Sequence, residues 1–413
     1  AGIAVAARRV IMHEKAVGAI ASLEENIGNN GAFDGTLGIG HTRWATHGGV
    51  TEANAHPHSD CAGQIWIVHN GIVENYKELR DELVSRGHLF RSETDTEAIA
   101  HLIEEEAKRY RAPDEAVRSA LVRVRGTYGL AVIFAREPRT LIAARYFSPL
   151  LIGIGKNEYF VASDASAVLR HTKQVIYLDD GEIADVSQDG VQIFTMSDEQ
   201  VDKHIEEVDW DEASAQLQGF SHFMLKEIFD QPTVYKDAIR GRYDLENATG
   251  KLGGLNMTEE EMRRVNRVIF IACGTAAYAG LVGKYAFERL VGIPSEVDVA
   301  SEFRYRDPII DENTLVFAIS QSGETADTLA AVREAKRKGA FVRGIVNVIG
   351  STIARETDGG SYIHAGPELA VASTKAYTNM IAILLLYALQ FGRLRKVSLA
   401  TGERILTALR EVS

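Results

Sequence analysis

The sequence of 413 residues contains little cysteine, a deficit of positive charge and no long apolar run. Its two cysteines, Cys61 and Cys273, lie far apart, which excludes a disulfide framework and is typical of a reducing compartment. The net charge of −12 argues against nucleic acid as the main partner. The longest apolar run, Met380–Leu389, has about half of the roughly 20 residues that a membrane span needs. We therefore expect a cytoplasmic protein without a membrane or nucleic-acid partner.

The two ends of the chain also lack ordinary features. The chain opens without a methionine, on a stretch that already reads as a strand, and it closes in the middle of a predicted helix. We therefore expect a piece of a longer chain. The composition, with 46% hydrophobic and 25% charged residues, is that of a globular protein, and the length predicts two or three domains.

The pattern of short apolar segments changes along the chain. Up to about residue 200, β-branched and aromatic segments alternate with glycine and asparagine, and two amphipathic helices appear, one stopping at Gly87 and one capped by Asp95. An acidic, polar stretch follows. From Arg264, apolar strands alternate with helices, which predicts a doubly wound parallel sheet. We expect a first domain over 1–209, a linker over 210–235 and a second domain over 236–413.

Three loops at the ends of predicted strands in the second domain carry hydroxyl groups and small residues. They are Cys273–Ala277, Ser320–Thr325 and Val371–Lys375. Any one of these loops is explained by simple helix capping, since serine and threonine are good N-caps. Three such loops at one edge of a sheet instead favour a phosphoryl ligand at helix N-termini. A sugar phosphate is the better interpretation, because no G-x-x-x-x-G-K-[ST] motif and no well-placed G-x-G-x-x-G motif occurs.

The segment "GHTRWATHGG" in the first domain combines polar groups with glycines. Arg43 offers a planar fork for a carboxylate, and Asp95 would suit an α-ammonium group. Asn70 and Gly71 follow an apolar run, where an amide and a glycine N–H can form an oxyanion hole. Together these residues predict a pocket for an amino acid whose side-chain carbonyl is attacked. Taken alone, Asn70-Gly71 is better read as a hairpin turn.

Histidines are concentrated near this segment, and zinc binding is the alternative interpretation. They are His41, His47, His56, His58 and His69. No H-E-x-x-H motif occurs, and the histidines fall on several turns, so they are explained equally well by packing. We expect no metal site and no cofactor.

A nucleophile for the first domain is not apparent. Cys61 lies in the polar stretch "SDCAGQ" and reads as a loop residue, and Cys273 ends a strand of the other domain. Neither cysteine has an adjacent histidine base in the sequence.

At this point the motifs resemble a known family over nearly the whole chain. "HTRWATHG", "NAHPH", "VHNGIVEN" and "SETDTE" resemble the glutamine amidotransferase domain that uses an N-terminal cysteine. "ACGT", "DVASEFRYR", "SQSGETADTL" and "VASTKAYT" resemble the first sugar-isomerase (SIS) subdomain of glucosamine-6-phosphate synthases, in the same order. The resemblance implies an incomplete N-terminal-nucleophile αββα sandwich, followed by a doubly wound SIS subdomain whose second copy is absent.

The resemblance also implies a reaction and its participants. Glutamine would be hydrolysed in the first domain, and ammonia would pass through an internal channel to aminate fructose 6-phosphate. The product, glucosamine 6-phosphate, opens hexosamine synthesis, and a homodimer is implied. The implied glutamine-binding residues are Arg43, Trp44, Thr46, His47, Gly71 and Asp95, with Asn70 and Gly71 as the oxyanion hole. The implied sugar-phosphate residues are Thr275, Ser320, Gln321, Ser322, Thr325, Val371 and Ser373.

The sequence departs from the family in three respects. The family's catalytic cysteine lies before the position that matches Ala1, and its second SIS subdomain, with the base and the Schiff-base lysine, is missing. The family usually has serine where this chain has Ala276. We therefore expect the chain as given to be inactive. A non-enzymatic SIS regulator that binds a sugar phosphate is the alternative, although such a sensor has no need of the glutamine-binding motifs.

Overall fold

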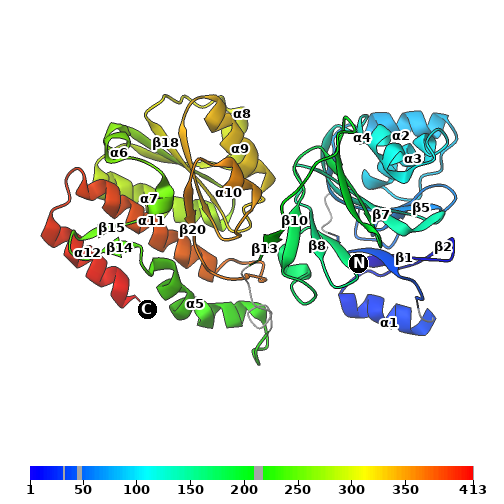
Figure 1. Cartoon of the computed structure of the whole chain (residues 1–413), viewed down its shortest axis with the longest axis horizontal. Helices are drawn as coiled ribbons and strands as arrows, with labels where there is room; N and C mark the ends of the chain where they lie inside the picture. The colour runs from blue at the N-terminus through cyan, green and yellow to red at the C-terminus, as the bar shows by residue number, and fades with distance from the viewer. Residues whose placement is uncertain (31–32, 44–48, 209–216, 413) are drawn as a thin grey trace. The chain divides into compact units, whose positions relative to one another are not determined.

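The protein is described by a computed structural model that covers residues 1–30, 33–43, 49–208 and 217–412. The chain consists of two compact units, Ala1–Glu207 (unit 1) and Val208–Ser413 (unit 2) (Figure 1). No helix in the described residues is both long enough and apolar enough to cross a membrane.

A six-stranded antiparallel sheet forms the centre of unit 1, with the strand order β12-β11-β7-β6-β5-β4. Its strands are β4 (His58–Ser59), β5 (Ile65–Val73), β6 (Gly126–Phe134), β7 (Glu137–Tyr146), β11 (Glu182–Ser187) and β12 (Gly190–Thr195). Side chains alternate between its faces, as a strand requires. In β5, Ile65 and Ile67 join the core under the helices, whereas Trp66 and Val68 join the core on the opposite face.

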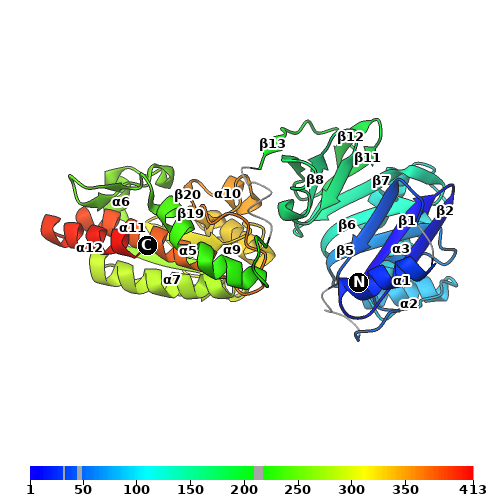
Figure 2. The same ribbon diagram turned by 90° about the horizontal axis from the view of Figure 1, so that it is seen from below.

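Helices cover one face of this sheet and further strands cover the other, as Figure 2 shows. The helices are α2 (Tyr76–Ser85), α3 (Thr96–Glu106) and α4 (Pro113–Leu121). The strands form two small antiparallel sheets, β1 (Gly2–Ala7) with β2 (Val10–Lys15) and β3 (Leu37–His41), and β8 (Leu151–Ile154) with β9 (Tyr159–Ala162), β10 (Gln174–Tyr177) and β13 (Glu206–Glu207). A helix, α1 (Ile20–Asn30), contacts β2. The layers follow the expected αββα order.

Unit 2 is built on a parallel sheet with the strand order β17-β16-β18-β19-β20. Its strands are β16 (Arg267–Ala272), β17 (Ser295–Val299), β18 (Thr314–Ser320), β19 (Phe341–Val346) and β20 (Gly360–Tyr362). Both faces are buried, which explains why "RVIFIA" and "TLVFAIS" read as continuous apolar runs. The doubly wound sheet is therefore confirmed, and its strand order reverses between β16 and β18.

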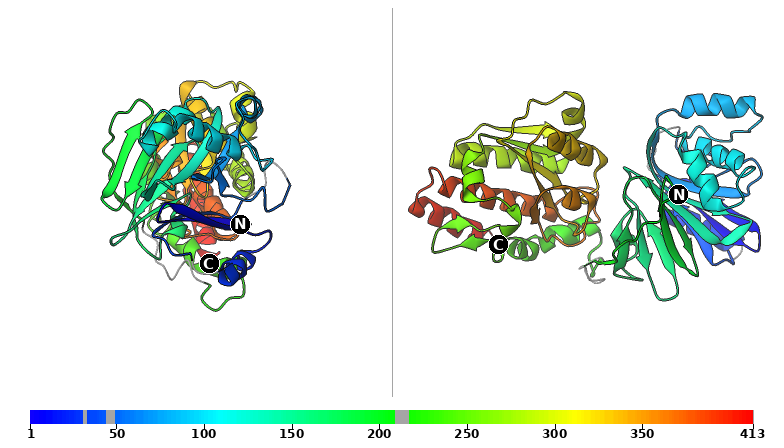
Figure 3. Two further views of the ribbon diagram at one scale, coloured as in Figure 1. Left: turned by 90° about the vertical axis from the view of Figure 1, so that its right-hand side faces the viewer. Right: turned by 45° about the horizontal axis from the view of Figure 1, so that its top comes forward.

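Helices lie on both faces of the parallel sheet (Figure 3, right). One face carries α5 (Phe223–Ile239), α6 (Glu259–Arg264), α7 (Thr275–Ala286), α11 (Lys375–Arg393) and α12 (Leu399–Glu411). The other carries α8 (Ala300–Tyr305), α9 (Ala326–Arg337) and α10 (Thr352–Glu356). A short hairpin, β14 (Tyr243–Asp244) and β15 (Thr249–Gly250), contacts α11 and α12.

The expected linker over 210–235 is wrong in its second half. From residue 223 this stretch is part of α5, which packs along α11. The Lys375 ammonium lies 3.1 Å from an Asp230 carboxylate oxygen, and the Asn379 amide donates to the Val234 carbonyl at 3.0 Å. Within this helix, Lys226 and Asp230 pair with each other, and Asp230 also pairs with Lys375 of α11, so the segment is packed into unit 2 and is not a free linker.

Candidate functional site

A cavity of about 480 Å³ in unit 1 is lined by Arg43, a predicted glutamine-binding residue, and by Asn70 of the predicted oxyanion hole. It opens at the end of β3, against the middle of β5 and β6, and against the segment after β9. Its walls include Gly40–Arg43, Val68–Asn70, Gly129, Ala131, Leu150, Val161–Ser163 and Ala167. Arg43 and Asn70, which are distant in sequence, therefore line one cavity.

Asn70 and Gly71 lie inside a strand, so the hairpin-turn interpretation is wrong. They belong to β5 and pair with Gly129 and Tyr128 of β6. Gly71 has φ +150°, and a Cβ at this position would lie 2.1 Å from the Thr127 carbonyl oxygen. The strand approaches its neighbour so closely that only glycine fits here without strain. The exposed Asn70 side chain stands on the cavity wall beside this glycine.

Arg43 is held in a left-handed backbone conformation, with φ +53°. Its backbone N–H donates to His41 Nδ1 at 3.0 Å, and its guanidinium donates to the Gly49 carbonyl at 3.0 Å. The Asn54 amide donates to the same carbonyl, also at 3.0 Å. The backbone around Arg43 is thus tied to the segment that follows it. Three other predicted glutamine-binding residues lie outside the described residues: Trp44, Thr46 and His47.

Asp95 is buried, with 4% of its surface exposed, and it is not among the residues lining the cavity. One carboxylate oxygen accepts a hydrogen bond of 2.7 Å from the backbone N–H of Val73 at the end of β5. Asp95 is the N-cap residue of α3, but its side chain makes no capping hydrogen bond. The predicted side-chain cap is therefore wrong, because the carboxylate is used to fasten the helix start to the sheet.

Four of the five histidines considered as zinc ligands pack as neutral rings. His41 and His56 stack with ring centroids 4.4 Å apart, and His56 meets His58 edge-on at 4.8 Å. Burial, reinforced by neighbouring positive groups, lowers the pKa of His41 to about 4 and that of His58 to about 3. Their nitrogens have separate protein partners, such as Thr94 for His58 and Thr96 for His69. This arrangement supports the packing interpretation.

A second cavity, of about 180 Å³, lies at the carboxyl ends of β16 and β18 in unit 2. Parallel sheets of this kind bind ligands where the strand order reverses, which is between these two strands. Every predicted sugar-phosphate residue except Val371 lines it: Thr275, Ser320, Gln321, Ser322, Thr325 and Ser373. Cys273, Ala276, Ile319 and Met380 complete the lining. Val371 is 96% exposed and lies outside the cavity.

The hydroxyl groups of the loop Ser320–Thr325 form hydrogen bonds within that loop, and none of them caps the start of α7 or α9. Ser320 Oγ accepts from the Gly323 N–H at 3.0 Å and lies 3.0 Å from Thr325 Oγ1, and Ser322 Oγ accepts from the Glu324 N–H at 3.1 Å. Neither Gly274 nor Thr325 provides a side-chain cap for α7 or α9, which start here. Simple capping therefore does not explain this loop. Two helix N-termini and several hydroxyls face a cavity whose described lining contains no lysine or arginine.

One group of polar residues was not found by sequence reasoning. Cys61 lies beside two histidines and a glutamate. His88 belongs to the segment that follows α2, and His101 and Glu104 belong to α3. The isolated cysteine gave no signal, because its histidine neighbours are 27 and 40 residues away along the chain. The pair His101 and Glu104, three residues apart on one helix face, was the only local hint.

Comparisons with known proteins agree with this division of the chain. A family model for a glutamine amidotransferase domain matches residues 41–170, and one for the SIS domain matches residues 261–390. The chain is 49% identical to a glutamine–fructose-6-phosphate aminotransferase [isomerizing] of Thermus thermophilus, covering 100% of this chain and 67% of that protein. It is 48% identical to the protein so named from Clostridium tetani, covering 95% of this chain.

The chain spans 64% of the length of the Clostridium tetani protein and 67% of that of the Thermus thermophilus protein, which is about two thirds of the length of each relative. Among solved structures, the C-terminal domain of glucosamine-fructose-6-phosphate aminotransferase from Francisella tularensis is 32% identical, with a TM-score of 0.45. That match covers 48% of this chain and 56% of the other.

Proposed function

The chain belongs to the glutamine–fructose-6-phosphate aminotransferase [isomerizing] family, and from this premise we propose that it supplies the glutamine site and a sugar-phosphate site of that reaction. In the complete protein, nitrogen from glutamine would pass to fructose 6-phosphate and give glucosamine 6-phosphate. The observation that carries the proposal is the cavity of unit 2, where three loops bring together six of the seven predicted sugar-phosphate residues.

The phosphate of the sugar would lie at the starts of α7 and α9. Backbone N–H groups at a helix N-terminus and hydroxyl donors together bind a dianion without a positively charged side chain. Ser320, Ser322 and Thr325 surround one such start, and Thr275 begins the other helix. The Ser373 hydroxyl is buried and has no hydrogen-bond partner among the described residues, so it is available to a sugar hydroxyl.

Glutamine would bind in the cavity of unit 1. The Arg43 guanidinium suits its α-carboxylate, and the Asn70 amide and Gly71 N–H suit the oxyanion that forms when the side-chain amide is attacked. This assignment is supported by the common cavity of Arg43 and Asn70. The roles of Trp44, Thr46, His47 and Asp95 remain predictions. For Asp95 the indirect role of holding α3 against β5 has the better support.

Neither of the two cysteines is placed to attack glutamine in the cavity of unit 1. Cys61 lies with His88 and His101, and Cys273 lines the cavity of unit 2, so neither cysteine lines the unit 1 cavity in the described residues. We therefore expect these 413 residues to release no ammonia from glutamine. Ammonia release that is abolished by Cys61→Ser would contradict this expectation, because it would make Cys61 the nucleophile.

Binding to the chain as it stands tests the sugar-phosphate site. Isothermal titration with fructose 6-phosphate should give saturable binding, and fructose should give none. Thr325→Ala should weaken the binding several-fold, while Thr407→Ala, on the exposed face of α12, should leave it unchanged. Equal binding of fructose and its phosphate, or no effect of Thr325→Ala, would remove the support for a phosphate site.

Glutamine binding separates the enzyme from the alternative of a sugar-phosphate regulator. The enzyme proposal expects glutamine to stabilise unit 1 and expects Arg43→Lys to abolish that effect, since lysine lacks the planar fork. A regulator would respond to the sugar phosphate alone. We also expect a homodimer, which sedimentation velocity would detect, and a cytoplasmic location, which fractionation of cells would test.

A further inference from the structure

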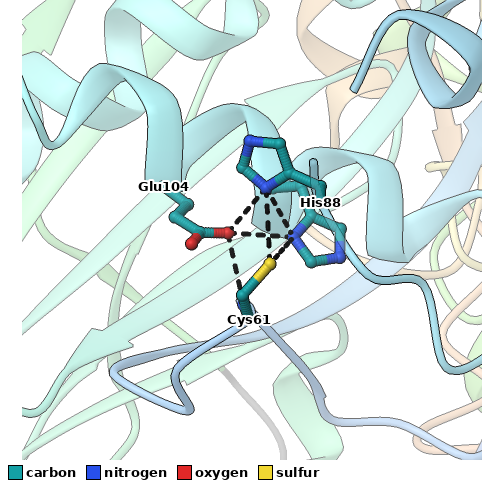
Figure 4. A group of neighbouring side chains, drawn as sticks. Cys61, His88 and Glu104 are labelled. Carbon is teal, nitrogen blue, oxygen red and sulfur yellow. Dashed lines mark hydrogen bonds and ion pairs between the residues drawn. The ribbon is translucent and has the colours of Figure 1, made fainter. Parts of the chain in front are cut away.

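Four potential metal ligands meet beside the C-terminal half of α3 in unit 1, away from the cavity that Asn70 lines, and Figure 4 labels three of them, Cys61, His88 and Glu104. Cys61 comes from the turn between β4 and β5, His88 follows α2, and His101 and Glu104 belong to successive turns of α3. One ligating atom of each residue lies within 4.8 Å of all the others. Three segments that are separate in sequence therefore converge on one point.

The distances between these atoms fit the edges of a tetrahedron. Cys61 Sγ lies 3.5 Å from His88 Nδ1 and 3.6 Å from His101 Nδ1. The two Nδ1 atoms are 3.2 Å apart, and Glu104 Oε2 lies 2.9 Å from the first and 3.0 Å from the second. Zinc bonds of roughly 2.0–2.1 Å to nitrogen or oxygen and 2.3 Å to sulfur require tetrahedral edges of about 3.3–3.6 Å. Five of the six edges lie within about half an ångström of these lengths, and all four ligating atoms lie within 4.8 Å of one another.

Hydrogen bonds alone account poorly for this arrangement. A ring nitrogen carries either one proton or one lone pair, directed outward in the plane of the ring. His88 Nδ1 nevertheless faces a carboxylate oxygen, another ring nitrogen and a sulfur at once. One proton can serve only one of these neighbours. A cation at their common centre contacts all four atoms.

A carboxylate on the far nitrogen of His88 supplies a second, independent indication. His88 Nε2 lies 2.7 Å from a Glu105 carboxylate oxygen, within hydrogen-bond distance, whereas His101 Nε2 is 3.7 Å from Glu97 Oε1 and makes no hydrogen bond to it. Glu97 is itself held by the backbone N–H groups of Arg91 and Ser92, each at 2.7 Å. A carboxylate on the far nitrogen is the usual environment of a metal-bound histidine, because it orients the ring and favours the tautomer with a free Nδ1 lone pair.

We propose that Cys61, His88, His101 and Glu104 bind a Zn²⁺ ion as a structural site. The thiolate and the carboxylate balance the charge of the ion, and a mixed sulfur, nitrogen and oxygen set in tetrahedral geometry selects zinc over magnesium or calcium. On binding, the S–H bond of Cys61 breaks, its proton leaves to solvent and a Zn–S bond forms, and each imidazole binds through an Nδ1 lone pair, a proton held there also leaving to solvent. Four protein ligands leave no position for substrate, which is typical of a structural site.

Metal analysis of the whole chain tests the proposal. The tag-free protein is treated with a chelator, incubated with zinc chloride, desalted and analysed by mass spectrometry of the metal. We expect one zinc per chain, retained in the presence of excess Mg²⁺. Cys61→Ser and His88→Gln should each lose it. Cys273→Ser and His171→Gln, which change the other cysteine and an exposed histidine, should retain it.

The absorption spectrum of bound Co²⁺ tests the site in the wild-type chain, so this test does not require a variant that folds. Co²⁺ bound to the wild-type chain should give a thiolate-to-cobalt charge-transfer band in the near ultraviolet and the visible bands of tetrahedral cobalt. The spectrum should lose its charge-transfer band in Cys61→Ser, with circular dichroism confirming an unchanged fold. Wild-type protein that binds no zinc, that binds zinc equally after Cys61→Ser, or whose cobalt spectrum lacks the thiolate band would overturn the proposal.

Discussion

Gly71 of β5 lies so close to Thr127 of β6 that a Cβ at position 71 would stand 2.1 Å from the Thr127 carbonyl oxygen. The conformation of Gly71, with φ +150°, is also unfavourable for any residue with a side chain. We expect Gly71→Ala to lower the free energy of unfolding of unit 1 by about 2–4 kcal/mol, measured by urea unfolding.

Gly190 is a matched control for this substitution. Its φ of +140° is similar, but no atom lies within 4 Å of the position that a Cβ would take. Gly190→Ala should therefore cost only about 1 kcal/mol, from the backbone conformation alone. Equal losses in the two variants would mean that the close approach of β5 to β6 has no energetic consequence.

Ala276 lines the cavity of unit 2 at the position where the family resemblance led us to expect a serine. A hydroxyl group here would add one donor to the proposed phosphate, for about 1 kcal/mol. We expect Ala276→Ser to bind fructose 6-phosphate about fivefold more tightly by isothermal titration. Ala277→Ser, one residue farther along α7 and outside the cavity lining, should leave the affinity unchanged. Tighter binding in both variants would contradict a local effect at the phosphate.

The buried histidines predict acid sensitivity of unit 1. Burial, with Lys15 acting in the same direction, lowers the pKa of His58 from 6.5 to about 3. Below pH 6.5 the unfolded chain therefore binds a proton that the folded chain does not, and stability falls as the pH decreases toward 3. One such histidine contributes about 1.4 kcal/mol per pH unit.

The free energy of unfolding, measured by urea titration at several values between pH 6.5 and 4, tests this linkage. His58→Gln retains a polar group for Thr94 but removes the titrating ring, so the slope should become shallower. The exposed His171 provides the comparison, since His171→Gln should leave the slope unchanged. An unaltered slope in His58→Gln would show that the acid sensitivity arises elsewhere.

Asp230 of α5 lies between two lysines, 2.7 Å from the Lys226 ammonium and 3.1 Å from the Lys375 ammonium. Both lysines are buried, and Lys375 is only 2% exposed. We expect Asp230→Asn to destabilise unit 2 by about 2–4 kcal/mol, because it leaves the ammonium groups without the carboxylate between them. Asp237→Asn breaks an exposed pair with Arg240 on the same helix and should cost less than about 1 kcal/mol. Thermal unfolding of both variants would show whether α5 is integral to unit 2.

Much of the architecture and of the candidate sites could be predicted from local patterns. Continuous apolar runs indicated the buried parallel strands of unit 2, and the serine-rich loop after β18 indicated a ligand at the sheet edge. Asn70-Gly71 was misleading. The dipeptide is common in hairpin turns, but here it lies inside β5, where the close approach of β6 leaves no room for a side chain at position 71. Asp95 was a similar case, since its side chain accepts from Val73 in place of capping its own helix.

The sequence by itself determined the two-part organisation, the alternation of buried and exposed side chains and the chemical identity of each loop. These properties depend on residues close together in the chain, where periodicity and composition act directly. Only the tertiary structure decided that Arg43 shares a cavity with Asn70, that α5 is bound to α11, and that Cys61 meets His88, His101 and Glu104. The physical reason is that such contacts join distant segments, and their formation depends on how whole sheets and helices pack.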